Sequence, residues 1–180
     1  MIMLTISREA IVKVQNHAWN GFCLGYEAFG LFLGKQNEQV IYAALPCFQI
    51  PIDYENPAQI SEIDIADFIK NARFVGQKFE LEVIGCYTTQ WKIIRNSDVI
   101  KQANINLVMK YHPSLCCKSC SGYSFEQGGK ELEYHKGDYV VSSGKRICNE
   151  INPKKILKEW NSFNYMTSID SSIQKRKVCV

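Results

Sequence analysis

The chain has 180 residues, of which 46% are hydrophobic and 22% are charged, and its formal net charge is +3 at pH 7. This composition predicts one globular domain and excludes a mostly disordered chain. The small net charge argues against nucleic acid as the main partner, and no apolar run approaches the roughly 20 residues of a membrane span. Residues 1–90 hold 6 basic and 10 acidic side chains, whereas residues 91–180 hold 15 and 8. This uneven distribution favours a polarised surface and a binding role.

The predicted elements of the first half are, in chain order, a helix at residues 7–19, strands at 28–33 and 40–45 around a polar turn, an irregular loop marked by three prolines, and a helix that begins at Ser61. The first helix is expected because Ile11, Val14 and Ala18 recur at helical spacing. The dipeptide Asn20-Gly21 is expected to end it.

The predicted elements of the second half are strands at residues 79–87 and 105–111, a short helical turn at 97–103 between them, a loop at 112–123, a hairpin at 124–134, a strand at 138–142 and a last helix that ends near Phe163. The hairpin is expected because Gly128-Gly129 favours a tight two-residue turn. Lys154-Lys155 lies in the first turn of the last helix and is expected to be solvated surface. Together the elements predict a mixed α/β domain over residues 1–165 and a polar, flexible tail over residues 166–180.

Three segments resemble the MPN/JAMM family, which comprises zinc-dependent deubiquitinating metalloproteases and their inactive relatives. A helix followed by a glutamate and a strand of the family's "GLLLG" type is matched by NHAWNGFCLGYEAFGLFLGK, which contains Glu27. The strand that ends in the family's metal-binding turn is matched by ELEVIGCYTTQW, and the strand after it by INLVMKYHP. The resemblance covers about residues 7–113. It implies an α/β, MPN-like (JAB/MPN) domain, with a curved mixed β-sheet flanked by helices.

The resemblance also implies where a metal site would be. In the family, two histidines and an aspartate bind zinc, and an upstream glutamate acts as general base on the zinc-bound water. In a gapless match, Thr88 and Gln90 occupy the histidine positions and Lys101 the aspartate position, while Asp98 stands where the family has a serine. A hydroxyl, a neutral amide and a cation are poor zinc ligands. We therefore expect no catalytic residues, no metal at this site and no cofactor. Glu27 is expected to be hydrogen-bonded to the backbone, Thr88, Thr89 or Gln90.

The resulting expectation is a catalytically inactive pseudoenzyme that acts as a scaffold or partner-binding subunit of a multiprotein assembly. Its partner would be a protein, such as another MPN-type subunit or a ubiquitin-like protein. The first and last helices carry Trp19, Trp160 and Phe163, which either cover the chain's own sheet or anchor a partner. One alternative is an isopeptidase-like hydrolase with an unconventional metal site or a thiol site at Cys86.

A second alternative is a small binding module stabilised by zinc through the loop Cys116–Cys120. Cys117 and Cys120 have the spacing of half a structural zinc site. The other ligands would come from elsewhere, with His112, His135 and Cys148 as candidates. The first residues reach charged side chains too early for a signal peptide. Reduced thiols in a cytoplasmic protein are therefore expected for the eight cysteines.

Overall fold

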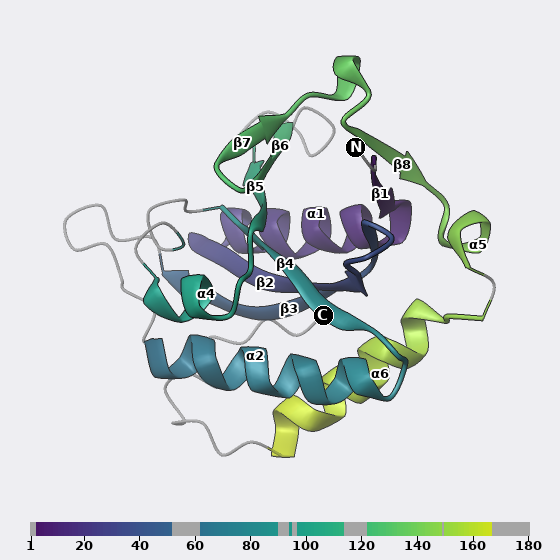
Figure 1. Ribbon diagram of the computed structural model, residues 1–180. Coiled ribbons are helices and arrows are strands. Elements are labelled where there is room, and N and C mark those ends of the chain that lie inside the picture. Colours follow the sequence, from purple (N-terminus) through teal and green to yellow (C-terminus); the bar gives the residue numbers. More distant parts are fainter. Residues whose placement is uncertain are drawn as a thin grey trace.

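The structure is a computed structural model that describes residues 3–51, 62–89, 94, 97–113, 122–148 and 150–166. It is a mixed α/β fold built on one eight-stranded sheet, in the order β7-β6-β5-β4-β2-β3-β1-β8 (Figure 1). The strands are β1 (Leu4–Ser7), β2 (Tyr26–Lys35), β3 (Val40–Pro51), β4 (Glu82–Thr88), β5 (Leu107–His112), β6 (Gly122–Gln127), β7 (Lys130–Leu132) and β8 (Tyr139–Ser142). Strand β2 is antiparallel to both of its neighbours, whereas β1 is parallel to β3 and β8, and β4 is parallel to β5.

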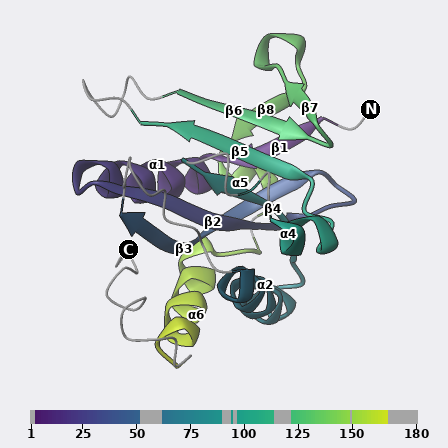
Figure 2. The same ribbon diagram turned by 90° about the vertical axis from the view of Figure 1, so that its left-hand side faces the viewer.

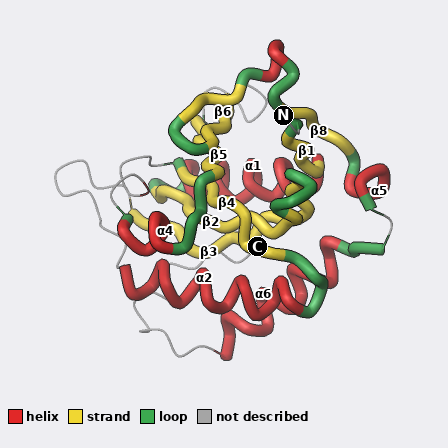
Figure 3. Tube along the Cα trace, in the orientation of Figure 1, coloured by secondary structure: helices red, strands yellow, loops and turns green. Residues whose placement is uncertain are grey.

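The helices lie on both faces of this curved sheet (Figures 1 and 2). They are α1 (Arg8–Cys23), α2 (Glu62–Gln77), α4 (Asp98–Gln102), α5 (Gly144–Ile147) and α6 (Pro153–Met166), and a 3₁₀ turn, η2, covers Tyr134–Lys136. Figure 3 shows the same arrangement with the helices in red and the strands in yellow. The sheet curves enough to bring the rings of Phe125 on β6 and Tyr139 on β8 to a centroid distance of 4.9 Å. No helix of the described residues is long and apolar enough to cross a bilayer.

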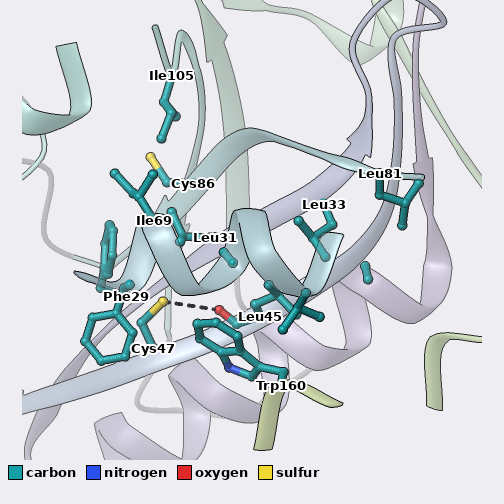
Figure 4. Close-up of a cluster of buried hydrophobic side chains, with 14 of the residues drawn as sticks. Phe29, Leu31, Leu33, Leu45, Cys47, Ile69, Leu81, Cys86, Ile105 and Trp160 are labelled. Carbon is teal, nitrogen blue, oxygen red and sulfur yellow. Dashed lines mark hydrogen bonds between the residues drawn. The ribbon is translucent and has the colours of Figure 1, made fainter. Parts of the chain in front are cut away.

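The two faces of the sheet form two hydrophobic cores. Alternate residues of a strand point to opposite faces, so Phe32 belongs to the inner core with α1, whereas Leu31 and Leu33 belong to the outer core with α2 and α6. The outer core also includes Trp160 (Figure 4). Its indole N–H donates to the Pro46 carbonyl at 2.8 Å. Both faces of the sheet are thus buried under helices, as the nearly continuous apolar runs of the central strands require.

The beginning of the chain differs from the expectation. A strand, β1, precedes the first helix and was not predicted; four residues carry too short a pattern to be recognised. Ser7 caps α1 by accepting a hydrogen bond from the Ala10 N–H at 3.1 Å. The predicted end at Asn20-Gly21 was wrong, because the helix continues to Cys23. Gly21 is buried within this last part of the helix.

The predicted loop after residue 45 was also wrong in its first part, because β3 continues through two prolines to Pro51. Proline is tolerated where a strand needs no N–H on one side. The pairing of β3 with β2 contains a bulge next to Pro46. The Pro46 carbonyl accepts a hydrogen bond from the Trp160 indole. The predicted hairpin turn is confirmed, since Gly128 and Gly129 have φ values of 59° and 82°, which suit a type I′ turn.

Candidate functional site

Strands β2 and β4 bring Glu27 next to the end of β4. The register pairs Phe29 with Thr88, and the hydroxyl of Thr89 donates a short hydrogen bond to the Glu27 carboxylate. The same hydroxyl accepts from the Ala28 N–H at 2.9 Å, and the Thr89 N–H donates to the Ala28 carbonyl at 3.1 Å. The carboxylate is therefore engaged by a hydroxyl fixed to the backbone of the neighbouring strand. The expected hydrogen bond of Glu27 to this turn is confirmed, and its partner is Thr89.

The residues at the implied metal positions do not fit a zinc ion. Thr88 is buried and offers a neutral hydroxyl, and Gln90 lies outside the described residues. Asp98 and Lys101 lie on α4, with side chains 80% and 63% exposed, and form an ion pair at 3.7 Å. An ammonium group cannot bind a cation, and here it is paired with the Asp98 carboxylate. Within the described part of the chain, no three His, Cys, Asp or Glu side chains are grouped as metal ligands.

Ser97 has a structural role beside these positions. Its side chain accepts from the Ile100 N–H at 3.2 Å and so caps α4. Its hydroxyl donates to the Glu62 carboxylate at 3.0 Å, and the Val99 N–H donates to the same oxygen at 3.1 Å. Glu62 is the first residue of α2, so this contact ties the start of α2 to the start of α4. Sequence reasoning missed it, because 35 residues separate Ser97 from Glu62.

The buried thiol of Cys86 does not have the properties of a nucleophile. Its side chain is fully buried in the outer core, and burial raises the pKa of the thiol. A nucleophilic cysteine needs a stabilised thiolate and an accessible sulfur atom. The environment of Cys86 therefore gives no support to the alternative of a thiol hydrolase.

A buried contact between a histidine and a tyrosine in the inner core was not predicted from the sequence. His17 Nδ1 lies 2.8 Å from the Tyr87 hydroxyl, and the two rings contact each other edge to face. The pKa of His17 is lowered to about 3, mainly by burial and secondly by the nearby Lys13 charge. Burial raises the pKa of Tyr87, so both groups are neutral at pH 7. The pair is a buried polar contact, and 70 residues of intervening chain hide it from sequence inspection.

Of the predicted zinc loop, Cys116, Cys117 and Cys120 lie outside the described residues. Of the remaining candidates, His112 is exposed at the end of β5. Cys148 is half-buried and packs against the outer core. His135 lies 2.8 Å from Glu133. Structural zinc at this loop stays a prediction.

Two of the three predicted partner anchors can be placed. Trp160 is 0% exposed and packs against Phe68 inside the outer core. It cannot contact a partner, so its assignment as an anchor was wrong. A helical apolar stripe looks the same whether it covers its own sheet or another protein. Trp19 is half-buried on α1 and contacts the ring of Phe22. The side chain of Phe163 lies outside the described residues.

A groove between α1 and α6, here called the α1–α6 groove, has a volume of about 370 Å³. Strand β1 pairs with β3 at Val40 and Ile41 before the chain turns into α1. The next residues of β3 then form the floor between the two helices. The lining residues are Arg8, Glu9, Ala10, Val12, Lys13, Asn16, Tyr42, Ala43, Ala44, Pro153, Lys154 and Leu157.

Comparisons with known proteins establish the fold and nothing finer. No family model and no curated protein matches this sequence. Among solved structures, the chain is similar to protein DSY2949 from Desulfitobacterium hafniense, with a TM-score of 0.51 and 15% sequence identity. The match covers 78% of this chain and 94% of that protein. At this identity the likeness concerns the path of the backbone, so the chain shares a mixed α/β fold with a solved bacterial protein.

Proposed function

We propose that this protein is a catalytically inactive MPN-like domain that acts as a scaffold or partner-binding subunit of a protein assembly. The observation that carries the proposal is the state of Glu27. In an active member of the family, the glutamate must be able to take a proton from a metal-bound water. Here its carboxylate accepts a hydrogen bond from the Thr89 hydroxyl. That hydroxyl in turn accepts a hydrogen bond from the Ala28 N–H, which fixes its position. Thr88 and Lys101 supply no metal ligand beside it.

The arrangement of the elements supports the MPN-like part of this proposal. The glutamate lies on the strand that pairs with β4, and β4 ends where the resemblance puts the metal-binding turn. A short helix, α4, and a parallel strand, β5, follow in the expected order. In this proposal the function comes from the surface of the domain and not from chemistry at this position. Helix α1 offers a half-buried Trp19, and Leu24, directly after its end, is 72% exposed.

An activity assay tests the inactive site. The purified chain and its Glu27→Gln variant would be incubated with conjugates of a ubiquitin-like protein, with zinc and with a chelator. We expect no cleavage by either protein, because the glutamate has no metal-bound water to activate. Zinc-dependent cleavage that the chelator and Glu27→Gln both abolish would overturn the proposal.

An assembly assay tests the scaffold role. The tagged chain would be purified gently from its native host and its native mass measured, together with Trp19→Ala and the matched control Phe74→Ala. Phe74 is 49% exposed on α2 and lies under Lys78. We expect the parent and the control to be found in a larger complex that Trp19→Ala loses while remaining folded. A monomer in all three preparations would contradict the proposal.

A further inference from the structure

The α1–α6 groove has an apolar interior. Its floor is the part of β3 that contains Ala43 and Ala44, two small residues whose side chains belong to the outer and the inner core respectively. Val12 on α1 and Leu157 on α6 form its walls. Val12 is 44% exposed, so its apolar side chain is available at the wall of the groove. A groove of this volume can accept one or two large apolar side chains.

The rim of the groove is basic. Arg8, Lys13 and Lys154 line it, and none of the three takes part in an ion pair among the described residues. The one acidic lining residue, Glu9, already accepts a hydrogen bond from the Gly144 N–H at 2.9 Å. The first turns of α1 and α6 both meet the groove, since Arg8 and Pro153 are their first residues. The positive ends of two helix dipoles therefore add to the positive charge of the rim.

The side of α1 that lines the groove at Val12 and Asn16 continues along the helix to Trp19. Val12, Asn16 and Trp19 follow each other at intervals of four and three residues, so they share one side of the helix. From Arg8 to Trp19 this side extends about 17 Å, at 1.5 Å per residue. A free amphiphile would fill the groove without reaching Trp19, whereas a segment of about five extended residues would cover the whole length.

We propose that the α1–α6 groove binds an acidic segment of a partner protein, which inserts a large apolar side chain over Ala43 and Ala44 and directs carboxylates to Arg8, Lys13 and Lys154. This deepens the proposed function by naming the chemistry of the partner, and it rests on that function. It also gives Lys154 a role beyond that of solvated surface. Small residues form the floor, so the inserted side chain comes close to the strand, and the basic rim selects against basic sequences.

Peptide selection on the full chain tests the proposal. A random 12-residue displayed library would be selected against the purified protein, and the best peptide synthesised with a fluorescent label for anisotropy titrations. We expect Asp and Glu to be enriched around a large apolar residue, and affinity to fall as salt rises. Selected peptides without acidic enrichment would overturn the proposal, as would displacement of the peptide by decanoate at equal concentration, which would indicate a site for a free amphiphile.

The groove itself is located by charge reversal. The test variant is Arg8→Glu/Lys154→Glu. Both residues are exposed and lie in the first turn of a helix. A carboxylate is favourable at that end of a helix, so the variant is expected to fold. We expect this variant to bind the peptide at least tenfold more weakly, and Val12→Asp to do the same. The control, Lys155→Glu/Lys158→Glu, makes the same change of charge on exposed residues of α6 that do not line the groove. It should change affinity less than twofold.

Equal losses in the two double variants would place the interaction elsewhere and overturn the assignment. These titrations use the isolated chain, so their result does not depend on whether an assembly is recovered from the host. A peptide that binds in the groove while the host preparation is monomeric would contradict only the scaffold role. A complex that persists in Arg8→Glu/Lys154→Glu would contradict only the groove.

Discussion

The close approach of Gly30 to Tyr87 shows how a single missing side chain shapes the inner core. A Cβ atom placed on Gly30 would lie 2.2 Å from the nearest atoms of the Tyr87 ring. The ring cannot withdraw easily, because it is fully buried and its hydroxyl lies against His17. The glycine is therefore needed for space, at the point where β2 passes β4.

We expect Gly30→Ala to lower the free energy of unfolding by about 1–3 kcal/mol, as overpacking of a core does. Urea unfolding measures it. Gly122→Ala is the control, since no atom lies within 4 Å of a Cβ there, and it should change stability by less than about 0.5 kcal/mol. Equal effects of the two substitutions would show that the ring of Tyr87 is free to move.

His17 makes stability depend on pH. Burial lowers its pKa from 6.5 to about 3 in the folded chain, so below pH 6.5 the unfolded chain takes up a proton that the folded chain does not. Stability is therefore full above pH 6.5 and falls as the pH drops toward 3. Between about pH 7.5 and about pH 5.5 the loss due to this residue is about 1 kcal/mol.

The prediction is measured by comparing the parent with His17→Gln, which keeps a polar partner for Tyr87 and removes the titration. The drop in unfolding free energy over this pH range should be smaller in the variant by about 1 kcal/mol. Exposed histidines and carboxylates titrate alike in both proteins and cancel. The same drop in both would mean that His17 is protonated in the folded state.

At the scale of elements, Trp160 is the largest buried side chain that holds α6 to the sheet. Trp160 is fully buried, and its indole N–H donates to the Pro46 carbonyl at 2.8 Å. We expect Trp160→Ala to cost about 3–5 kcal/mol of stability, measured by thermal or urea unfolding. Trp19→Ala, on the half-buried side of α1, should cost much less. A Trp160→Ala variant as stable as the parent would mean that α6 is not packed on the sheet.

The same residue shows what a helical pattern predicts and what it does not. The spacing of Ile156 and Trp160 predicts α6 and its apolar side correctly. It does not reveal whether that side faces β3 or another protein, because both surfaces are apolar. The hydrogen bond to Pro46 joins residues 114 positions apart. In β3, likewise, the prolines argued locally for a loop, and contacts with β2 and α6 made the segment a strand.

At the scale of the whole molecule, curvature brings distant strands together. β6 and β8 are near opposite ends of the strand order, yet Phe125 and Tyr139 pack ring against ring at 4.9 Å. Because Phe125 is fully buried, this contact closes the inner core around α1. The fold therefore depends on side chains that meet across the open edge of the sheet.

We expect Phe125→Ala to destabilise the chain by about 3–5 kcal/mol and to speed amide hydrogen exchange in both β1 and β8. Tyr134→Ala is the control, since its ring is 65% exposed although it also contacts Tyr139. Faster exchange confined to β6 and β7 would show that the two ends of the sheet are stable independently.

The sequence by itself determined local elements: the helices that begin after Ser7 and Ser97 and the hairpin at Gly128-Gly129. Each depends on residues only a few positions apart, whose steric and hydrogen-bonding preferences act within one turn or strand. The Glu27–Thr89 contact, the His17–Tyr87 pair, the burial of Trp160 and the α1–α6 groove were decided by tertiary structure. They join residues 62 or more positions apart in the first three cases, and in the groove they join α1, β3 and α6. Only tertiary packing specifies which apolar helix face covers which face of the sheet, and this packing depends on the whole chain.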